Sequence, residues 1–507
     1  MITIFVRVIF LLFILVTVVC VILKVTPVTL VKLRFPKVEK IIYDSWSNRR
    51  FTVTLWMVLL ICWLPAYLAF FPGIFGYDAP NQMQQLLGLV PLSAHHPIFH
   101  TAILGGLMKC GEYIFGNGNG GVALFCVLQG ILVTGSLAYT FLFMKKKRTP
   151  FWILFISFIG CACNPVTQIL SFNITKDILF GVSFLHFVIS CYEWLGEDSR
   201  KTSMGMFRLI LWGILSCLLR NQGKYIILVL LLISIFMCKK DKKFLVSLGM
   251  VVLVIQLFST VSTNVFGVIK SDAKEMLSIP MQQMAFVCTQ YKQQNDVNLT
   301  KEEFDKFMLL IAEENLNNYT PDISDPIKMY FNTEILKQDL SGYFNLYFSV
   351  GLKNPKEYFM AMYHMILPYW DMSQNRFRHV AAENTFPDLL TGWGISQNTL
   401  LPQYKEFLID YLTNTMGDKN SLVFCFFQPG ICIWIMMALL GMALYRKDKG
   451  SLIGAGTLFL FFGTLLLGPV ALLRYIYPLM LATPWMVALL CESLMQKEEN
   501  ILEEKVK

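Results

Sequence analysis

Ionisable side chains next to strongly apolar segments are the clearest chemical signal in this sequence. Asp78 follows an apolar run that ends in Pro72 and Gly73, and histidines come soon after it. A charged group beside lipid is costly, so such residues are functional candidates by default. The candidate residues are these ionisable side chains together with the tyrosine that follows Arg474. They are Asp78, His95, His96, His100, Lys176, Asp177, Arg220, Lys224, Arg474 and Tyr475.

These residue types are those needed to transfer a group from a lipid phosphate. Arginine binds a phosphate with two parallel hydrogen bonds, and lysine supplies a point charge. A carboxylate can act as general base for an acceptor hydroxyl. Apolar helices around such a site can hold a long lipid tail. The pattern therefore favours transfer from a lipid phosphate carrier to an acceptor outside the membrane.

The composition is that of a membrane protein with many spans. The 507 residues are 55% hydrophobic and 15% charged, whereas soluble proteins carry roughly 25% charged residues. Apolar stretches of about 20 residues recur along the chain. The net charge of +9 comes from short basic clusters between apolar segments, which is typical of cytoplasmic loops. Nucleic acid is therefore not an expected partner.

Neither a disulfide framework nor a metal-thiolate site is expected. The 13 cysteines lie mostly inside apolar segments, and no Cys-x-x-Cys pair occurs. His95, His96 and His100 stand close together, but no carboxylate-rich motif accompanies them as a zinc site would require. We expect these histidines to shape the loop.

The positions of lysine and arginine predict how the chain threads the membrane. Basic clusters at 32–50, 145–148, 200–208, 239–243 and 446–449 mark the cytoplasmic side. About eleven spans result, with the N-terminus outside and the C-terminus inside. Their expected ranges are 3–23, 52–71, 121–143, 151–163, 177–195, 207–219, 225–237, 244–262, 421–445, 451–469 and 473–492.

The threading decides between two apolar segments that compete to cross the membrane after Asp78. Segment 98–115 carries His100, Lys109 and Glu112, which are expensive in lipid. Segment 121–143 has only Gln129 as a strongly polar residue, so we expect it to be the span. We expect 98–115 to lie in the outer interface as an amphipathic helix.

The same threading places all the candidate residues on the outer face and divides the chain into three parts. Residues 1–262 form an N-terminal transmembrane module with a catalytic outer loop at 72–120. Residues 263–420 form a mainly helical extracytoplasmic domain. Residues 421–507 supply the last transmembrane helices and a short cytoplasmic tail. We thus expect a multi-pass protein of the cell membrane with its active site on the extracytoplasmic face.

Three motifs resemble the GT-C superfamily of polytopic glycosyltransferases. They are "GYDAPNQ" with "HHPIF" after the second span, "NITKDILFG" at the start of a later span, and "LLRYIYPLMLATPW" at the last one. That superfamily includes protein O-mannosyltransferases, aminoarabinose transferases and oligosaccharyltransferases. The chain also resembles an uncharacterised group of bacterial GT-C-like proteins through "LLRNQGKYI", "IPMQQMA" and "YTPDISDPIK".

The resemblance implies an all-α GT-C fold and a role for several residues. Asp78 matches the catalytic aspartate, Asp177 the second acidic position, and Arg474 the arginine that contacts the lipid phosphate. His96 and Pro97 match a His-Pro-Pro motif whose second proline is Ile98 here. Some members bind a divalent metal (Mg or Mn), but no Asp-x-Asp pair stands at Asp78. The implied partners are a polyprenyl-phosphate sugar donor, membrane lipids, and a glycan, lipid or protein acceptor.

Simpler structural roles and other functions remain open at this point. Asp78 suits the N-cap of the following helix, and Lys176 with Asp177 suits a neutralised helix start. Arg220 and Lys224 suit snorkelling anchors. Among functions, a glycolipid flippase or transporter and a polysaccharide polymerase share the coarse features. The early Asp78 loop and "HHPIF" favour a glycosyltransferase.

Overall fold

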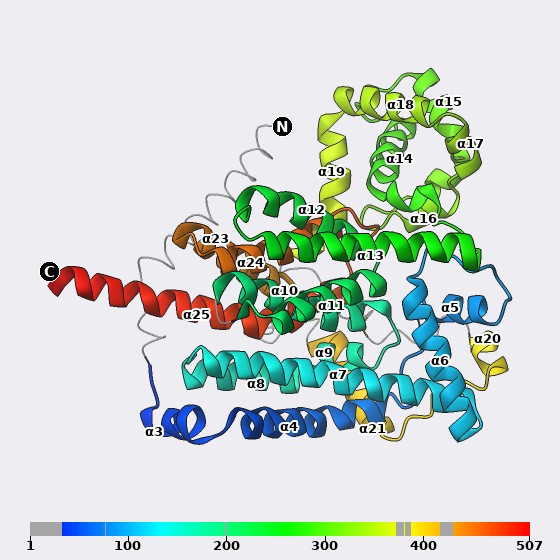
Figure 1. Cartoon of the computed structure of the whole chain (residues 1–507). Coiled ribbons are helices and arrows are strands. Elements are labelled where there is room, and N and C mark those ends of the chain that lie inside the picture. Colours follow the sequence, from blue (N-terminus) through cyan, green and yellow to red (C-terminus); the bar gives the residue numbers. More distant parts are fainter. Residues whose placement is uncertain are drawn as a thin grey trace.

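The computed structural model describes residues 33–76, 78–197, 200–371, 380, 387–415 and 429–506 (Figure 1). The span predicted at 3–23 lies outside these residues. The regular elements of the described residues are helices, accompanied by isolated β-bridges. The predicted all-α class is therefore confirmed.

Five helices are long and apolar enough to cross a membrane, which indicates a membrane protein. A sixth candidate is the pair α8 and α9, which is bent by 53°. Four more apolar helices are shorter, so the total of about eleven spans stays a prediction. The five are α4 (Asn48–Ala69), α7 (Gly118–Lys146), α10 (Lys176–Gly196), α13 (Lys242–Phe266) and the run Leu473–Met495. The others are α8 (Phe151–Cys163), α9 (Pro165–Ser171), α11 (Ser203–Leu219), α12 (Gln222–Met237), α23 (Pro429–Arg446) and α24 (Lys449–Leu465).

Helix α10 is the central helix of the bundle. Its apolar window is 83% buried, against 22% for α4 and 28% for α13. It packs against α11, α24, α7 and α25 (Tyr477–Val506). The outward faces of α4 and α13 are apolar and exposed, as expected of helices that face lipid. Most side chains of α10 are thus enclosed by protein, including the charged side chains of Asp177 and Glu193.

The segment expected at the outer interface forms α6 (Ile98–Phe115), which is not among the helices apolar enough to cross. It packs closely on α7, because a side chain at Gly111 would meet the backbone of Gly121 at 2.3 Å. Its far end is open, and Tyr113 is 91% exposed. Its placement relative to the membrane stays a prediction.

Residues between 277 and 358 form a second, separate apolar core. Figure 1 shows α14, α15, α17, α18 and α19 grouped beyond α13. A capping box at Thr300 and Glu303 starts α15, as the Thr-x-x-Glu pattern predicts. The described buried residues from Tyr369 to Leu412 pack instead with the larger core, which the apolar helices around α10 form. The helices are α14 (Ser278–Lys292), α15 (Lys301–Met308), α16 (Asp325–Met329), α17 (Thr333–Gln338), α18 (Leu340–Lys353) and α19 (Pro355–Ile366).

Short elements complete the described chain. Before α4 lie α3 (Pro36–Glu39) and η1 (Lys40–Ser45), and Asp78 is followed by α5 (Ala79–Leu86). The others are η3 (Ala273–Met276), η4 (Glu313–Asn318), η5 (Leu367–Tyr369), α20 (Pro387–Gly392), α21 (Pro402–Asp410), η7 (Tyr411–Thr415) and η8 (Leu473–Ile476).

Isolated β-bridges fix the loops that meet at the start of α10. The loop after α4 pairs with the loop before α10 through Ile74 and Asn173. The Ile74 amide donates to the carbonyl of Phe172 at 2.8 Å, and the Ile174 amide donates to the carbonyl of Ile74 at 2.9 Å. This pairing holds the chain around Asp78 beside Lys176.

The basic clusters predicted to be cytoplasmic meet at the opposite end of α10. Lys147 at the end of α7 lies 3.4 Å from Glu197, and Lys201 lies 3.6 Å from Asp241 at the start of α13. Gly450 at the start of α24 packs on Gly196. The two sets of charged residues that the sequence assigns to different faces therefore lie at different ends of one helix.

Candidate functional site

Four separate elements bring ionic side chains together at the N-terminal end of α10. Asp78 directly precedes α5, and Lys176 and Asp177 are the first two residues of α10. Arg220 follows α11, and Arg474 lies in the short helix η8. We call Asp78, Lys176, Asp177, Arg220 and Arg474 the ionic cluster. All five were predicted as site residues from the sequence.

The Asp78 carboxylate faces cations. Its Oδ2 atom lies 2.8 Å from Nζ of Lys176 and 3.5 Å from Nη1 of Arg474. The Nδ1 atom of His96 is 3.9 Å from the same oxygen. Asp78 occupies the N-cap position of α5, but its side chain makes no capping hydrogen bond. The ion pairs, rather than helix capping, therefore explain the position of the Asp78 side chain.

Asp177 is the most deeply buried member of the ionic cluster, with no exposed side-chain surface. It forms a tight ion pair with Arg220, and its Oδ2 atom lies 3.5 Å from Nη1 of Arg474. The Nη1 atom of Arg474 thus stands at 3.5 Å from each of the two carboxylates. Arg220 is buried as well, so it is not a snorkelling anchor.

Tyr475 packs against both arginines. Its ring centre lies 5.1 Å from Cζ of Arg220 and 4.9 Å from Cζ of Arg474. Contacts of this kind stabilise a guanidinium by cation–π attraction. Tyr475, which was predicted as a site residue, therefore orients the two arginines.

Within the described part of the chain, the five side chains of the ionic cluster are three cations and two carboxylates, with a net charge of +1. Burial opposes ionisation of Asp78, yet Lys176 and Arg474 outweigh it and hold the pKa of this carboxyl well below its ordinary value. The carboxylate is therefore ionised at neutral pH. The surplus positive charge suits one additional anion.

His96 is neutral in this setting. Burial, followed by the nearby charge of Lys176, lowers the pKa of His96 to about 3. Its Nδ1 atom lies 3.4 Å from Nζ of Lys176, so a neutral imidazole can accept a hydrogen bond from the ammonium. His96 thus helps to position Lys176.

Two predicted residues lie at or beyond the edge of the ionic cluster. His95 stacks edge-on against His96 with 4.6 Å between ring centres, and its Nδ1 atom lies 4.0 Å from Glu275. Lys224 is exposed and lies over the ring of Tyr225 at 4.8 Å. No interaction that joins Lys224 to the ionic cluster occurs in the described structure, so the anchor role fits this residue.

Two neutral polar residues behind the ionic cluster, Gln82 and Thr101, were not predicted from the sequence, and both lie at the predicted residue His100. His100 is completely buried, and its Nδ1 atom lies 3.1 Å from Nε2 of Gln82. The same amide nitrogen donates to Oγ1 of Thr101 at 2.9 Å. The mixture of polar and apolar residues in "NQMQQL" was the sequence feature that could have indicated a buried polar contact from this helix. These contacts tie α5 to α6 beneath Asp78.

The donor set of the described residues does not suit a divalent metal. No group of three or more histidine, cysteine or acidic side chains lies close enough together there to hold a metal ion. Both carboxylates of the ionic cluster already face cations, which would repel Mg²⁺ or Mn²⁺. We therefore derive no step through a metal.

Comparison with known proteins places the chain in one family. A model described as a family of unknown function (DUF6020) matches residues 88–506. The chain belongs to the DUF6020 family. The matched region includes His96, Lys176, Asp177, Arg220 and Arg474, whereas Asp78 lies just before it. No curated protein and no solved structure gives a significant match.

We predict that Arg220→Met destabilises this DUF6020 protein strongly. Removing one partner of a buried ion pair leaves an uncompensated charge and costs about 3 kcal/mol. The expected result is a thermal unfolding midpoint in detergent that falls by several degrees. Lys224→Met is the matched control, because Lys224 is exposed, and it should leave the midpoint unchanged. Equal effects of the two changes would contradict the buried pairing.

We predict that His96 stays uncharged well below pH 6.5. Its folded-state pKa of about 3 lies below the ordinary value of 6.5, so the unfolded chain binds a proton first as the pH falls. The stabilising contribution is complete above pH 6.5 and is lost as the pH drops toward 3. Nuclear magnetic resonance of labelled histidines, assigned with His96→Gln, should show no titration of His96 between pH 7 and pH 5. A midpoint near 6.5 would refute the assignment.

Proposed function

We propose that this chain is a membrane glycosyltransferase of the GT-C type. It transfers a sugar from a polyprenyl-phosphate donor to a glycan, lipid or protein acceptor on the extracytoplasmic face. The observation that carries the proposal is the position of Arg474, which stands between Asp78 and Asp177 at 3.5 Å from each carboxylate. An arginine for the phosphate and a carboxylate for the acceptor are thus adjacent.

The donor phosphate binds where Lys176 and Arg474 now hold Asp78. The excess positive charge of the ionic cluster favours this exchange, because an incoming phosphate restores neutrality. Lys176 is partly accessible, with 18% of its side chain exposed, whereas Arg474 is buried, with 9% exposed. Asp177 and Arg220 are the more enclosed pair, and they hold Arg474 in place as positioning residues.

Phosphate binding also prepares Asp78 as a base. In the resting protein Lys176 and Arg474 keep the pKa of Asp78 low, which makes it a weak base. When a phosphate neutralises those cations, the pKa of Asp78 rises toward a value suited to proton transfer. The site therefore gains its base only when the donor is bound.

The transfer then proceeds as a single displacement at the anomeric carbon of the sugar. Asp78 accepts the proton of an acceptor hydroxyl, and the oxygen forms a bond to the anomeric carbon of the sugar. The bond from that carbon to the phosphate oxygen breaks, and the lipid phosphate leaves with the electron pair. Lys176 and Arg474 stabilise the charge that develops on the leaving phosphate.

The extracytoplasmic placement rests on the distribution of charge. The ionic cluster stands at one end of α10, and the basic residues Lys147, Lys201 and Arg208 gather at the other. Basic residues near spans favour the cytoplasmic side. This arrangement supports an active site that faces away from the cytoplasm.

The decisive experiment compares wild type with Asp78→Asn in purified, folded protein. Release of sugar is followed from a panel of polyprenyl-phosphate sugars, and donor binding is measured in parallel. Loss of a positioned base should lower turnover about 100-fold or more while binding persists. Asp296→Asn is the matched control, because Asp296 is exposed and lies in the region of the second apolar core. This variant should retain full turnover.

Unchanged turnover in Asp78→Asn would refute the base assignment. Wild-type protein that releases no sugar from any donor, but moves a lipid-linked sugar across a vesicle bilayer, would instead establish a flippase.

A further inference from the structure

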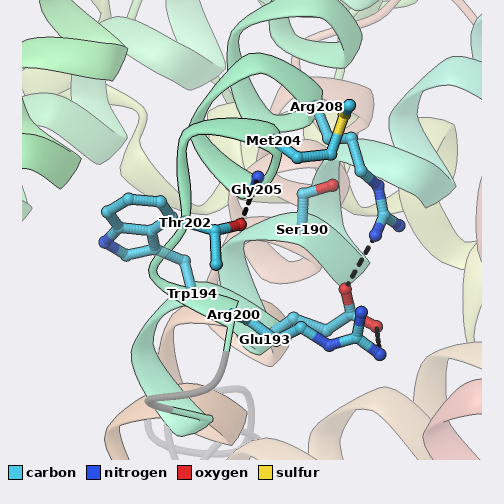
Figure 2. A pocket seen from close by; sticks show the side chains of 8 residues that line it. All are labelled: Ser190, Glu193, Trp194, Arg200, Thr202, Met204, Gly205 and Arg208. Carbon is cyan, nitrogen blue, oxygen red and sulfur yellow. Dashed lines mark hydrogen bonds and ion pairs between the residues drawn. The ribbon is translucent and has the colours of Figure 1, made fainter.

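A small pocket lies at the end of α10 opposite the ionic cluster (Figure 2). Its cavity volume is about 50 Å³, which is room for several water molecules or one small polar group. It is lined by Ser190, Glu193, Trp194, Arg200, Thr202, Met204, Gly205 and Arg208. Glu193 is about 24 Å along the helix from Asp177, at roughly 1.5 Å per residue. The pocket is therefore a separate site.

Two arginines share one buried carboxylate in this pocket. Nη1 of Arg208 lies 3.4 Å from Oε2 of Glu193, and Nη2 of Arg200 lies 3.7 Å from Oε1. Figure 2 shows both guanidinium groups beside the carboxylate of Glu193, with dashed lines for the ion pairs. Strong charge-assisted hydrogen bonds are about 2.7–2.9 Å long. Each guanidinium has five N–H donors, so both arginines keep donors for another acceptor besides Glu193, Glu197 and Tyr139. Two arginines and one carboxylate face the cavity.

Neighbouring groups hold this arrangement in place. Tyr139 donates from its hydroxyl to Oε1 of Glu193 at 3.3 Å and accepts from Nη2 of Arg208 at 2.9 Å. Nε of Arg200 lies 3.5 Å from Glu197, which also pairs with Lys147 at 3.4 Å. The carboxylate of Glu193 is buried, so its charge is fixed beneath the two arginines.

An exposed apolar stripe starts at the pocket. Met204, Phe207 and Leu211 are 65%, 57% and 36% exposed, and their spacing of three and four residues places them on one face of α11. Such a stripe beside a basic pocket fits a molecule with an anionic head and an apolar chain. The stripe and the two arginines are independent observations that indicate the same ligand class.

We propose that this pocket binds the phosphate of an anionic phospholipid, with an acyl chain along Met204, Phe207 and Leu211. Arg200 and Arg208 donate to the phosphate oxygens, as arginine does with bidentate phosphate partners. The two guanidinium groups favour an anionic phosphate, and a headgroup without a cation of its own avoids repulsion by them. The binding is independent of glycosyl transfer, because it uses none of the ionic cluster.

The test measures binding of phosphatidylglycerol to the purified full-length chain in phosphatidylcholine nanodiscs. Native mass spectrometry counts the bound lipid as its fraction is raised. Arg200→Gln should weaken binding about fivefold, the effect expected for one arginine near a membrane surface. The Arg200 side chain is 36% exposed, so we expect this variant to fold as the wild type does. Arg200→Lys should restore part of the affinity, because the positive charge returns.

Lys201→Gln is the matched control. Lys201 is the next residue, is equally exposed, and pairs with Asp241 outside the pocket. It should bind the lipid as wild type does. Equal weakening by both variants would reduce the effect to general surface charge and overturn the proposal. Inorganic phosphate that displaces the lipid at millimolar concentration, or binds as well without lipid, would identify a free phosphate as the ligand and also overturn it.

Discussion

The burial of Asp177 at the start of the central helix is the constraint on which the site depends. A carboxylate enclosed by apolar helices is tolerated only when it is paired. Arg220 and Arg474 pair it, and they come from the end of α11 and from the short helix before α25. The pairing therefore joins three distant segments, and Arg474 extends the connection to Asp78.

All five residues of the ionic cluster could be identified from the sequence because charge beside lipid is rare and costly. Asp78, Lys176, Asp177, Arg220 and Arg474 could be selected on that ground and assigned to one face by the distribution of lysine and arginine. The pairing itself could not be predicted, because it depends on how α10, α11 and η8 are rotated against each other. Gln82 and Thr101 were missed because neutral polar residues in a helix resemble ordinary core positions.

The count of spans shows a second limit of sequence reasoning. The apolar run predicted at 151–163 forms α8 with the same bounds, but hydropathy does not show that the chain then bends by 53° into α9. Asn164 caps the new helix and Pro165 begins it, so the bend has a local cause. Similarly, the region 263–420 read as one helical domain, whereas its described residues pack into two cores. Such divisions follow from tertiary packing rather than from composition.

The central claim is that a lipid phosphate and Asp78 compete for the same cations. The most direct measurement is the affinity of purified wild-type and Asp78→Asn protein for polyprenyl phosphate without a sugar. We expect tighter binding to Asp78→Asn, because the neutral amide no longer holds Lys176 and Arg474 by charge. Equal or weaker binding to Asp78→Asn would show that the carboxylate and the phosphate do not compete.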